Sequence, residues 1–265
     1  MANIKKLLIA GDFHVPYHDP ILFDLFLRFA SDFKPDYLVI NGDFLDCFAI
    51  SKFDKIPHSG RMKDELKMGW KLLKKIRDAL PEAEISYIEG NHEFRLRQYL
   101  IRNAPEIYDL APTLSELLEL NQFNIDWVGT KEGASKWVDT YKRFGQLYVG
   151  HWDRVNKHSA MTAKNLVEDK GVSLIQNHVH RGGVYHKRLE DGRQLVGIEN
   201  FCMCDLSPNY MGNVNWQQGW TVVYTDLEGS GRFHAYPIQV LGYKFFHQGK
   251  AYEVNPPKKL KVKRY

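Results

Sequence analysis

Five short polar motifs stand out in this sequence, and each follows an apolar run that reads as a buried strand. They combine carboxylates, an amide and histidines, a mixed oxygen and nitrogen donor set that suits Mn, Fe, Zn or Ni better than an all-oxygen calcium site. In chain order the motifs are Gly11-Asp12-Phe13-His14, Gly42-Asp43-Phe44-Leu45-Asp46, Gly90-Asn91-His92-Glu93, Gly150-His151 and His178-Val179-His180. The residue types alone therefore favour a transition-metal site.

Taken singly, each motif is weak, because Gly-Asp and Asn-His pairs are common in turns and isolated Asp, Asn or His residues often serve as caps. The spacing adds some information, since Asp12 and His14 would share one side of an extended segment. The order of the motifs adds more. Seven candidate ligands, each placed after an apolar strand, favour one shared site over seven unrelated turns.

The elements that must hold these motifs alternate between strand and helix. Strands are predicted at 4–10, 36–42 and 85–90, and each runs into one of the first three motifs. Helices are predicted after Asp19, which reads as an N-cap before Pro20, over 62–80, and up to about Arg102. This alternation predicts a largely parallel α/β sheet that carries its function on the carboxyl edge of the strands.

The second half of the chain is predicted to be richer in strands. Turn residues at Asp191-Gly192 and Glu228-Gly229 indicate hairpins. The other predicted elements are a short helix at 114–120, strands at 125–128, 146–150, 172–176 and 220–226, and a helix at 159–169. Because no linker or low-complexity stretch interrupts the chain, we expect one domain over 1–265 with a basic tail at 256–265.

Composition excludes little. The 265 residues are 44% hydrophobic and can bury a full core, while the net charge of +4 neither requires nor excludes a nucleic-acid partner. The basic tail would either steer a polyanion or form a solvated, frayed end. The sequence shows no signal peptide, no spanning helix and no C-x-x-C pair, which predicts a cytoplasmic protein without a membrane partner. It indicates no oligomeric state.

The pair Cys202 and Cys204 could bind a metal only with further ligands nearby. No second cysteine or histidine cluster stands beside the pair in the sequence. We therefore interpret both residues as structural and assign them no chemistry.

The ordered motifs resemble those of the calcineurin-like metallophosphoesterases, whose pattern is D-x-H, G-D-x-x-D, G-N-H-[DE], a lone G-H and G-H-x-H, over residues 4 to 185. The resemblance implies a four-layer α/β/β/α sandwich with two mixed β-sheets. It also implies two divalent metal ions, with Mn favoured and Fe, Zn or Ni as alternatives. The implied ligands are Asp12, His14 and His180 for the first ion, Asn91, His151 and His178 for the second, and Asp43 as a bridge, with Asp12 also reaching the second ion.

The resemblance further implies catalytic roles for two residues. His92 would protonate the leaving-group oxygen or stabilise the transition state, and Asp46 would orient its ring. The nucleophile would be a hydroxide that bridges the two metals.

Three departures from the family pattern bear on the substrate. Asn177 stands where the family has a glycine before the last His-x-His. Cys47 and Phe48 follow Asp46 where the protein serine/threonine phosphatases carry Arg-Gly, and Glu89 stands where they place an arginine. Those arginines clamp a phosphomonoester dianion, so their absence favours a phosphodiester, which has one negative charge less.

The leading hypothesis is therefore a phosphodiesterase, and a nuclease is its narrower form. The nuclease form is motivated by basic residues near the second motif, by Trp152 as a stacking platform beside His151, and by the basic tail. His180-Arg181 and the Asp-Leu-Ser-Pro stretch at 205–208 also resemble the nuclease-like and phage-associated branches. The basic residues near the second motif are Lys52, Lys55, Arg61 and Lys63.

Two alternatives stay open. One is a phosphomonoesterase that acts on a small molecule or a phosphoprotein. The other is an inactive metal-binding scaffold, which the intact set of seven ligands disfavours.

Overall fold

The computed structural model describes residues 3–54, 60–131, 133–206 and 214–255 of the chain. The basic tail, Lys55 and the end of the Asp-Leu-Ser-Pro stretch lie outside these ranges. The elements in chain order are β1 (Lys5–Ala10), α1 (Pro20–Phe33), β2 (Tyr37–Asn41), η1 (Phe48–Ile50), α2 (Met62–Ala79), β3 (Glu84–Ile88), α3 (Arg95–Asn103), η2 (Pro105–Leu110), α4 (Leu114–Leu117), η3 (Leu120–Phe123), β4 (Ile125–Val128), β5 (Thr140–Phe144), β6 (Leu147–His151), α5 (Met161–Lys170), β7 (Ser173–Gln176), β8 (Gly182–Arg188), β9 (Gln194–Asn200), β10 (Gly219–Thr225), β11 (Phe233–Gln239), β12 (Lys244–His247) and β13 (Lys250–Glu253).

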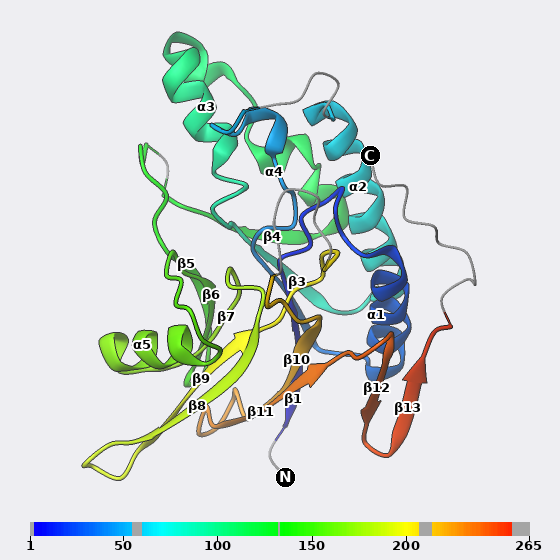
Figure 1. Cartoon of the computed structure of the whole chain (residues 1–265), viewed down its shortest axis with the longest axis vertical. Helices are drawn as coiled ribbons and strands as arrows, with labels where there is room; N and C mark the ends of the chain where they lie inside the picture. Colours follow the sequence, from blue (N-terminus) through cyan, green and yellow to red (C-terminus); the bar gives the residue numbers. More distant parts are fainter. Residues whose placement is uncertain (1–2, 55–59, 132, 207–213, 256–265) are drawn as a thin grey trace.

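Two mixed sheets form the centre of the molecule (Figure 1). The first has the order β11-β10-β1-β2-β3-β4, in which β1 to β4 are parallel to one another and β10 is antiparallel to both of its neighbours, β1 and β11. The second has the order β5-β6-β7-β9-β8, with β6, β7 and β9 parallel and an antiparallel strand at each edge. A separate hairpin, β12-β13, packs near α1.

The alternation of side chains along β1 explains the layers. Leu8 and Ala10 pack into a core with side chains of α1 and α2, whereas Leu7 and Ile9 pack into a second core with side chains of β6, β7 and β9. On the far face of the second sheet, α5 supplies Leu166 and Val167 to a third core. The order helix, sheet, sheet, helix confirms the predicted four-layer α/β/β/α sandwich with two mixed sheets.

The predicted elements are found with their ends shifted by a few residues, and both predicted hairpins form, as β8-β9 and β10-β11. The sequence reading missed β5, whose Thr-Tyr-Lys-Arg-Phe pattern carries two basic residues, and the β12-β13 hairpin. Of the helices within the described residues, none combines the length and the apolar character needed to cross a bilayer.

Asp19 is the N-cap of α1, as predicted, and also ties the helix to the end of the chain. Its Oδ1 accepts hydrogen bonds from the N–H groups of Ile21 at 3.0 Å and Leu22 at 3.1 Å. Its Oδ2 accepts from Gln218 Nε2 at 3.0 Å and from the Tyr243 hydroxyl at 2.9 Å. Because Gln218 precedes β10 and Tyr243 precedes β12, one buried carboxylate joins three parts of the first core.

We predict that Asp19→Ala lowers the free energy of unfolding by about 2–4 kcal/mol, since it removes a cap worth about 1 kcal/mol and leaves two donors without their acceptor. Chemical denaturation measures this loss. Asp24→Ala on the same helix is the control, because its exposed carboxylate makes only a 4.0 Å ion pair with Lys75. An equal loss in both variants would contradict the role given to Asp19.

Candidate metal centre

The nine predicted site residues come together at the carboxyl edge of the two sheets. Strands β1, β2 and β3 end just before the first three motifs, β6 ends at His151, and β7 ends just before Asn177. Parallel strands deliver their following residues to the same edge, so the topology gathers motifs that lie far apart in the chain. The residues brought together are Asp12, His14, Asp43, Asp46, Asn91, His92, His151, His178 and His180.

One group of possible ligands is Asp12, His14 and His180, whose donor atoms all lie within 4.8 Å of one another. All three side chains are buried, and His14 Nε2 lies only 2.9 Å from His180 Nε2. Two nitrogen ligands of one metal at about 2.1 Å would lie about 3.0–3.4 Å apart, close to this separation. Two buried ring nitrogens that face each other need a cation or a proton between them, so the donor set fits a metal ion.

The second group is Asp43, His151 and His178, with Asn91 beside it. His151 Nε2 lies 3.4 Å from Asp43 Oδ2, 3.3 Å from His178 Nδ1 and 3.2 Å from Asn91 Oδ1. These oxygen and imidazole donors converge on one point and also fit a divalent cation.

Asp43 faces both groups. Its Oδ2 is 3.4 Å from His151 Nε2 in the second group and 3.8 Å from His14 Nε2 in the first. Burial opposes ionisation, but the neighbouring His92 and His151 outweigh it and hold the pKa of Asp43 well below its usual value. A carboxylate that stays charged between two ligand groups has the position that a bridging ligand needs.

Glycines in two motifs make room for these contacts. Gly42 has a φ of +77°, and a Cβ atom there would lie 2.3 Å from His151 Nδ1. A Cβ atom on Gly90 would lie 2.2 Å from Asp43 Oδ1. Glycine therefore precedes Asp43 and Asn91 because the other ligands approach the backbone too closely for a side chain.

The backbone of the site is strained. Five of the possible ligands have left-handed φ values, a conformation that costs a non-glycine residue about 1–3 kcal/mol. They are Asp12 at 52°, His14 at 51°, Asp43 at 48°, His178 at 85° and His180 at 56°. Such strain persists only where the surrounding structure enforces it, and it is concentrated here on the residues that face one another.

Asp46 contacts two histidines. Its Oδ1 lies 3.1 Å from His92 Nδ1, the pair predicted from the sequence, and 3.0 Å from His14 Nδ1, a contact that was not predicted. Although burial opposes it, hydrogen bonds with both rings hold the pKa of Asp46 below its usual range. Burial is also the main cause that lowers the pKa of His92. The chain thus places Asp46 where it can orient both rings.

Glu93 and Asn177, both buried, organise the ligand loops. No role was predicted for them from the sequence. Glu93 accepts hydrogen bonds from the backbone N–H groups of Asp43 at 2.9 Å and Gly90 at 2.8 Å, which joins the second and third motifs. Asn177 donates to Asp12 Oδ2 at 3.1 Å and accepts from Asn41 and Asn200, both at 2.9 Å. Their signal was available, since Glu93 belongs to a motif and Asn177 departs from the family pattern.

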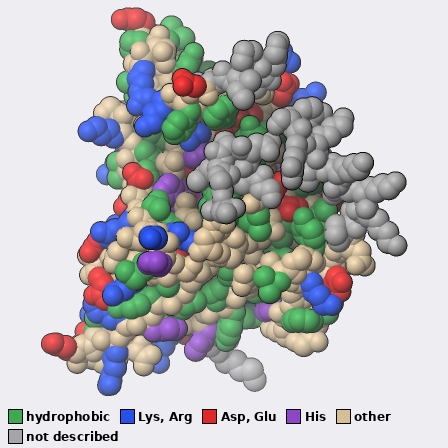
Figure 2. Space-filling model, viewed as in Figure 1, with side chains coloured by type: hydrophobic (Ala, Val, Ile, Leu, Met, Phe, Trp, Pro, Cys, Tyr) green, Lys and Arg blue, Asp and Glu red, His purple; other side chains and the backbone are tan. Residues whose placement is uncertain are grey.

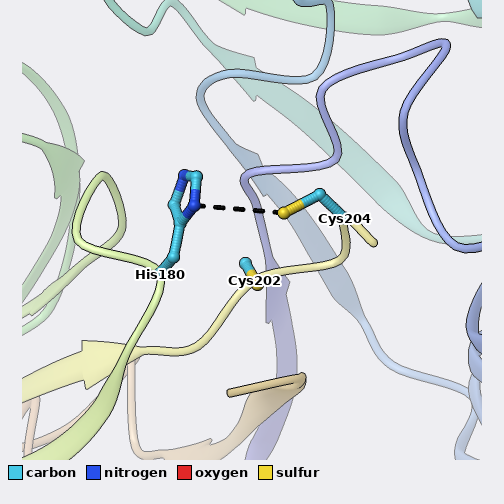
Figure 3. A group of neighbouring side chains, drawn as sticks. All are labelled: His180, Cys202 and Cys204. Carbon is cyan, nitrogen blue, oxygen red and sulfur yellow. Dashed lines mark hydrogen bonds between the residues drawn. The ribbon is translucent and has the colours of Figure 1, made fainter. Parts of the chain in front are cut away.

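The interpretation of the cysteine pair as structural stays a prediction, but folding brings a histidine beside the pair, His180. Figure 3 shows the Cys204 sulfur pointing toward the His180 ring, 3.9 Å from Nδ1. A hydrogen bond with Cys202 and burial raise the pKa of Cys204 well above its usual value, which keeps the thiol protonated. With Nδ1 next to this thiol, His180 presents Nε2 to His14.

The proposed stacking platform at Trp152 is wrong. Its side chain is 1% exposed and packs with Leu166 and Val167 under α5. Two half-buried tryptophans lie against the ligands instead, with the Trp216 ring 4.3 Å from the His180 ring and the Trp137 ring 5.8 Å from the His151 ring.

The basic residues near the second motif lie on the surface where they are described, namely Lys52, Arg61 and Lys63. The basic side chain that reaches the site is Arg95, the first residue of α3. It donates from Nη1 to the Asp46 carbonyl at 2.7 Å, and its Nη2 lies 2.9 Å from His92 Nε2. The sequence reading missed it because a single arginine after a motif carries no pattern of its own.

Comparison with known proteins identifies the family. Residues 5–201 match the model described as "Calcineurin-like phosphoesterase", so the chain belongs to this family and the resemblance seen in the motifs is confirmed. Members of the family bind divalent metals, and membership implies metal-dependent hydrolase activity.

Two curated relatives are similar over almost the whole chain. Both are called Gene 54 protein, from Mycobacterium phages L5 and D29, and are 26% and 27% identical, with 94% of this chain and 99% of each relative covered. Among solved structures, wild-type Vps29 complexed with Zn²⁺ from Entamoeba histolytica is similar at 12% identity with a TM-score of 0.42, covering 93% of this chain and 95% of that one.

We predict that the metal-free protein binds divalent ions more tightly as the pH rises from 6 to 9. Although burial opposes protonation, neighbouring carboxylates raise the pKa of His14 to about 9 and that of His151 to about 10, and burial raises the pKa of Asp12 to about 7. Below these values, protons compete with the metal for the same atoms.

Titration calorimetry with Mn²⁺ in buffers of different ionisation enthalpy measures both the affinity and the protons released. The expected slope is about tenfold in affinity per pH unit for each proton displaced. A pH-independent affinity without proton release would contradict the prediction.

Proposed function

We propose that this protein hydrolyses phosphodiesters with two divalent metal ions, Mn²⁺ first among them. The observation that carries the proposal is the position of Asp43, whose Oδ2 faces His151 Nε2 at 3.4 Å and His14 Nε2 at 3.8 Å. A carboxylate shared between two ligand groups is typical of two-metal phosphoesterases, in which the ions lie about 3.5–4 Å apart.

The seven ligands divide between the ions as the family resemblance implies. When bound, the two ions supply Lewis-acid stabilisation of the phosphoryl oxygens and lower the pKa of the attacking water. The residues that would hold them are Asp12, His14 and His180 for the first ion, Asn91, His151 and His178 for the second, and Asp43 between the two.

His92 is the proposed proton donor to the leaving-group oxygen. Its Nδ1 lies against Asp46, 2.9 Å from the carbonyl oxygen and 3.1 Å from Oδ1, so Nε2 faces the site 3.8 Å from Asp43 Oδ2. An incoming phosphate adds negative charge beside the ring and raises the pKa of His92, which favours the protonated form that donates.

A diester substrate is favoured over a monoester because Cys47 and Glu89 stand at the two positions where the serine/threonine phosphatases carry arginines. Cys47 is fully buried, and Glu89 is buried and accepts a hydrogen bond from the Thr130 N–H at 2.7 Å. Neither residue can clamp a dianion. Arg95, which adds positive charge at the site, is the observation that favours the monoesterase as second candidate.

Support for a nucleic-acid substrate comes from α3 and from the aromatic residues at the site. Figure 2 shows Lys and Arg side chains on the surface over α3, a helix that carries three arginines and no acidic residue. Trp137 and Trp216 could stack on bases. A nuclease should lose activity steeply with added salt, through release of the counterions of its substrate.

The direct test compares bis(p-nitrophenyl) phosphate with p-nitrophenyl phosphate, with Mn²⁺, Zn²⁺, Fe²⁺ or Ni²⁺ added, and includes single-stranded DNA at low and high salt. We expect kcat/KM to be at least about tenfold higher for the diester. A preference for the monoester would replace the proposal by the second candidate. A protein that binds these metals but hydrolyses neither aryl ester nor DNA would instead be the inactive metal-binding scaffold.

We predict that His92→Ala retains both metals but lowers kcat by about 100-fold or more, as expected for loss of a general acid. Asp43→Ala should lose metal as well as turnover, because it removes the ligand that both groups share. Metal analysis and steady-state kinetics measure the two effects. His186→Ala, which removes an exposed histidine of β8, is the control. Full activity in His92→Ala would refute the proposed role.

A further inference from the structure

Arg95 lies at the site but is not paired in the usual way. Its side chain is 15% exposed, and its two hydrogen bonds go to the Asp46 carbonyl and to His92 Nε2. Across the described ranges, no lysine and no other arginine forms a hydrogen bond or an ion pair with a predicted site residue. Arg95 is thus the cation that the fold places at the site.

The charge of Arg95 is only weakly compensated. Within the described residues, its ion pair is with Asp46 Oδ2, at 4.0 Å, while Oδ1 of the same carboxylate already contacts His14 and His92. A guanidinium has five N–H donors, and its planar fork matches two oxygens of a phosphate. Arg95 Cζ also lies over the Phe53 ring, 6.0 Å from its centroid, which takes up none of the N–H donors. A cation that rests on a carbonyl, a ring nitrogen and an aromatic ring keeps donors and charge for an anionic ligand.

The guanidinium also faces the reacting side of His92. Because Asp46 occupies His92 Nδ1, the Nε2 side of the ring looks toward Arg95 at 2.9 Å and Asp43 at 3.8 Å. A phosphoryl oxygen that accepted hydrogen bonds from Arg95 would replace the contact with Nε2. It would then lie beside the nitrogen that is proposed to donate the proton.

We propose that Arg95 binds the non-bridging oxygens of the scissile phosphoryl group, in place of the arginines that Cys47 and Glu89 replace. This inference rests on the proposed function, since it assigns the substrate contact of the same site. One guanidinium can bind two oxygens of a phosphoryl group at once, so Arg95 provides the phosphate affinity of a site that lacks the usual clamp.

A purely positioning role is the rival explanation, because Arg95 also holds the Asp46 carbonyl. Loss of that contact would disturb His92 and lower kcat, yet it would leave the affinity for inorganic phosphate unchanged. Phosphate affinity therefore separates the two roles.

The experiment uses the full chain loaded with Mn²⁺ and compares Arg95→Gln and Arg95→Lys with the parent. Arg28→Gln is the matched control, since it removes the same charge from an exposed position on a different helix, α1. Calorimetry measures binding of inorganic phosphate, kinetics measures its competitive inhibition, and metal analysis checks that both ions stay bound.

We expect phosphate affinity to fall at least about tenfold in Arg95→Gln, with kcat/KM for the aryl diester about 100-fold lower, the scale of a lost transition-state donor. Arg95→Lys should fall between Arg95→Gln and the parent, because lysine keeps the charge and loses the fork. Arg28→Gln should match the parent.

Phosphate affinity within twofold of the parent in Arg95→Gln would overturn the inference, and if that variant does not fold, the same result in Arg95→Met, which also removes the charge, would do so. A parent that binds phosphate through Arg95 but hydrolyses no ester would remove the proposed function and leave the inference standing. If the parent hydrolyses the diester but its phosphate affinity does not depend on Arg95, the proposed function stands and the inference about Arg95 falls.

Discussion

The buried carboxylate of Asp43 is the interaction on which the rest of the site depends. It faces His14 and His151 from the two ligand groups, its Oδ1 accepts the His92 N–H at 3.0 Å, and its own N–H donates to Glu93. A buried carboxylate stays ionised only if positive charge lies beside it, either on protonated histidines such as His14 and His151 or on metal cations. Glycine at position 42 and left-handed backbone at the neighbouring ligands follow from the need to bring these groups so close.

Buried amides hold the two sheets in the register that this arrangement requires. Asn41 at the end of β2 donates to the Gly150 carbonyl of β6 at 2.9 Å, and Asn200 at the end of β9 donates to the Ile9 carbonyl of β1 at 3.2 Å. Both also donate to Asn177, which in turn donates to Asp12. A buried polar network in a low-dielectric interior is sensitive to any shift, because a displaced donor loses its acceptor, so this network sets the position of one ligand group relative to the other.

The strands that precede the motifs could be predicted because they rest on local signals, whereas the four layers and the ligand set were implied by the family resemblance. An apolar run followed by Gly-Asp or Gly-Asn predicts where a strand ends. The alternation of strands with helices then predicts that the motifs meet at the carboxyl edge of a parallel sheet. Contacts between distant segments leave no such signal, which is why Cys204 beside His180 was missed. Arg95 was missed for another reason, because a single arginine three residues after His92 carries no pattern of its own. The error at Trp152 was avoidable, because it directly follows His151 in the chain and successive side chains of a strand point to opposite faces.

The central claim, that Asp43 lies between two metal ions, is tested most directly by electron paramagnetic resonance of the Mn²⁺-loaded protein together with metal analysis. Two ions about 3.5–4 Å apart and bridged by a carboxylate are magnetically coupled. The account predicts two Mn²⁺ per chain with an exchange-coupled spectrum that is lost in Asp43→Asn. One Mn²⁺ per chain at saturation, with the spectrum of an isolated ion, would contradict it.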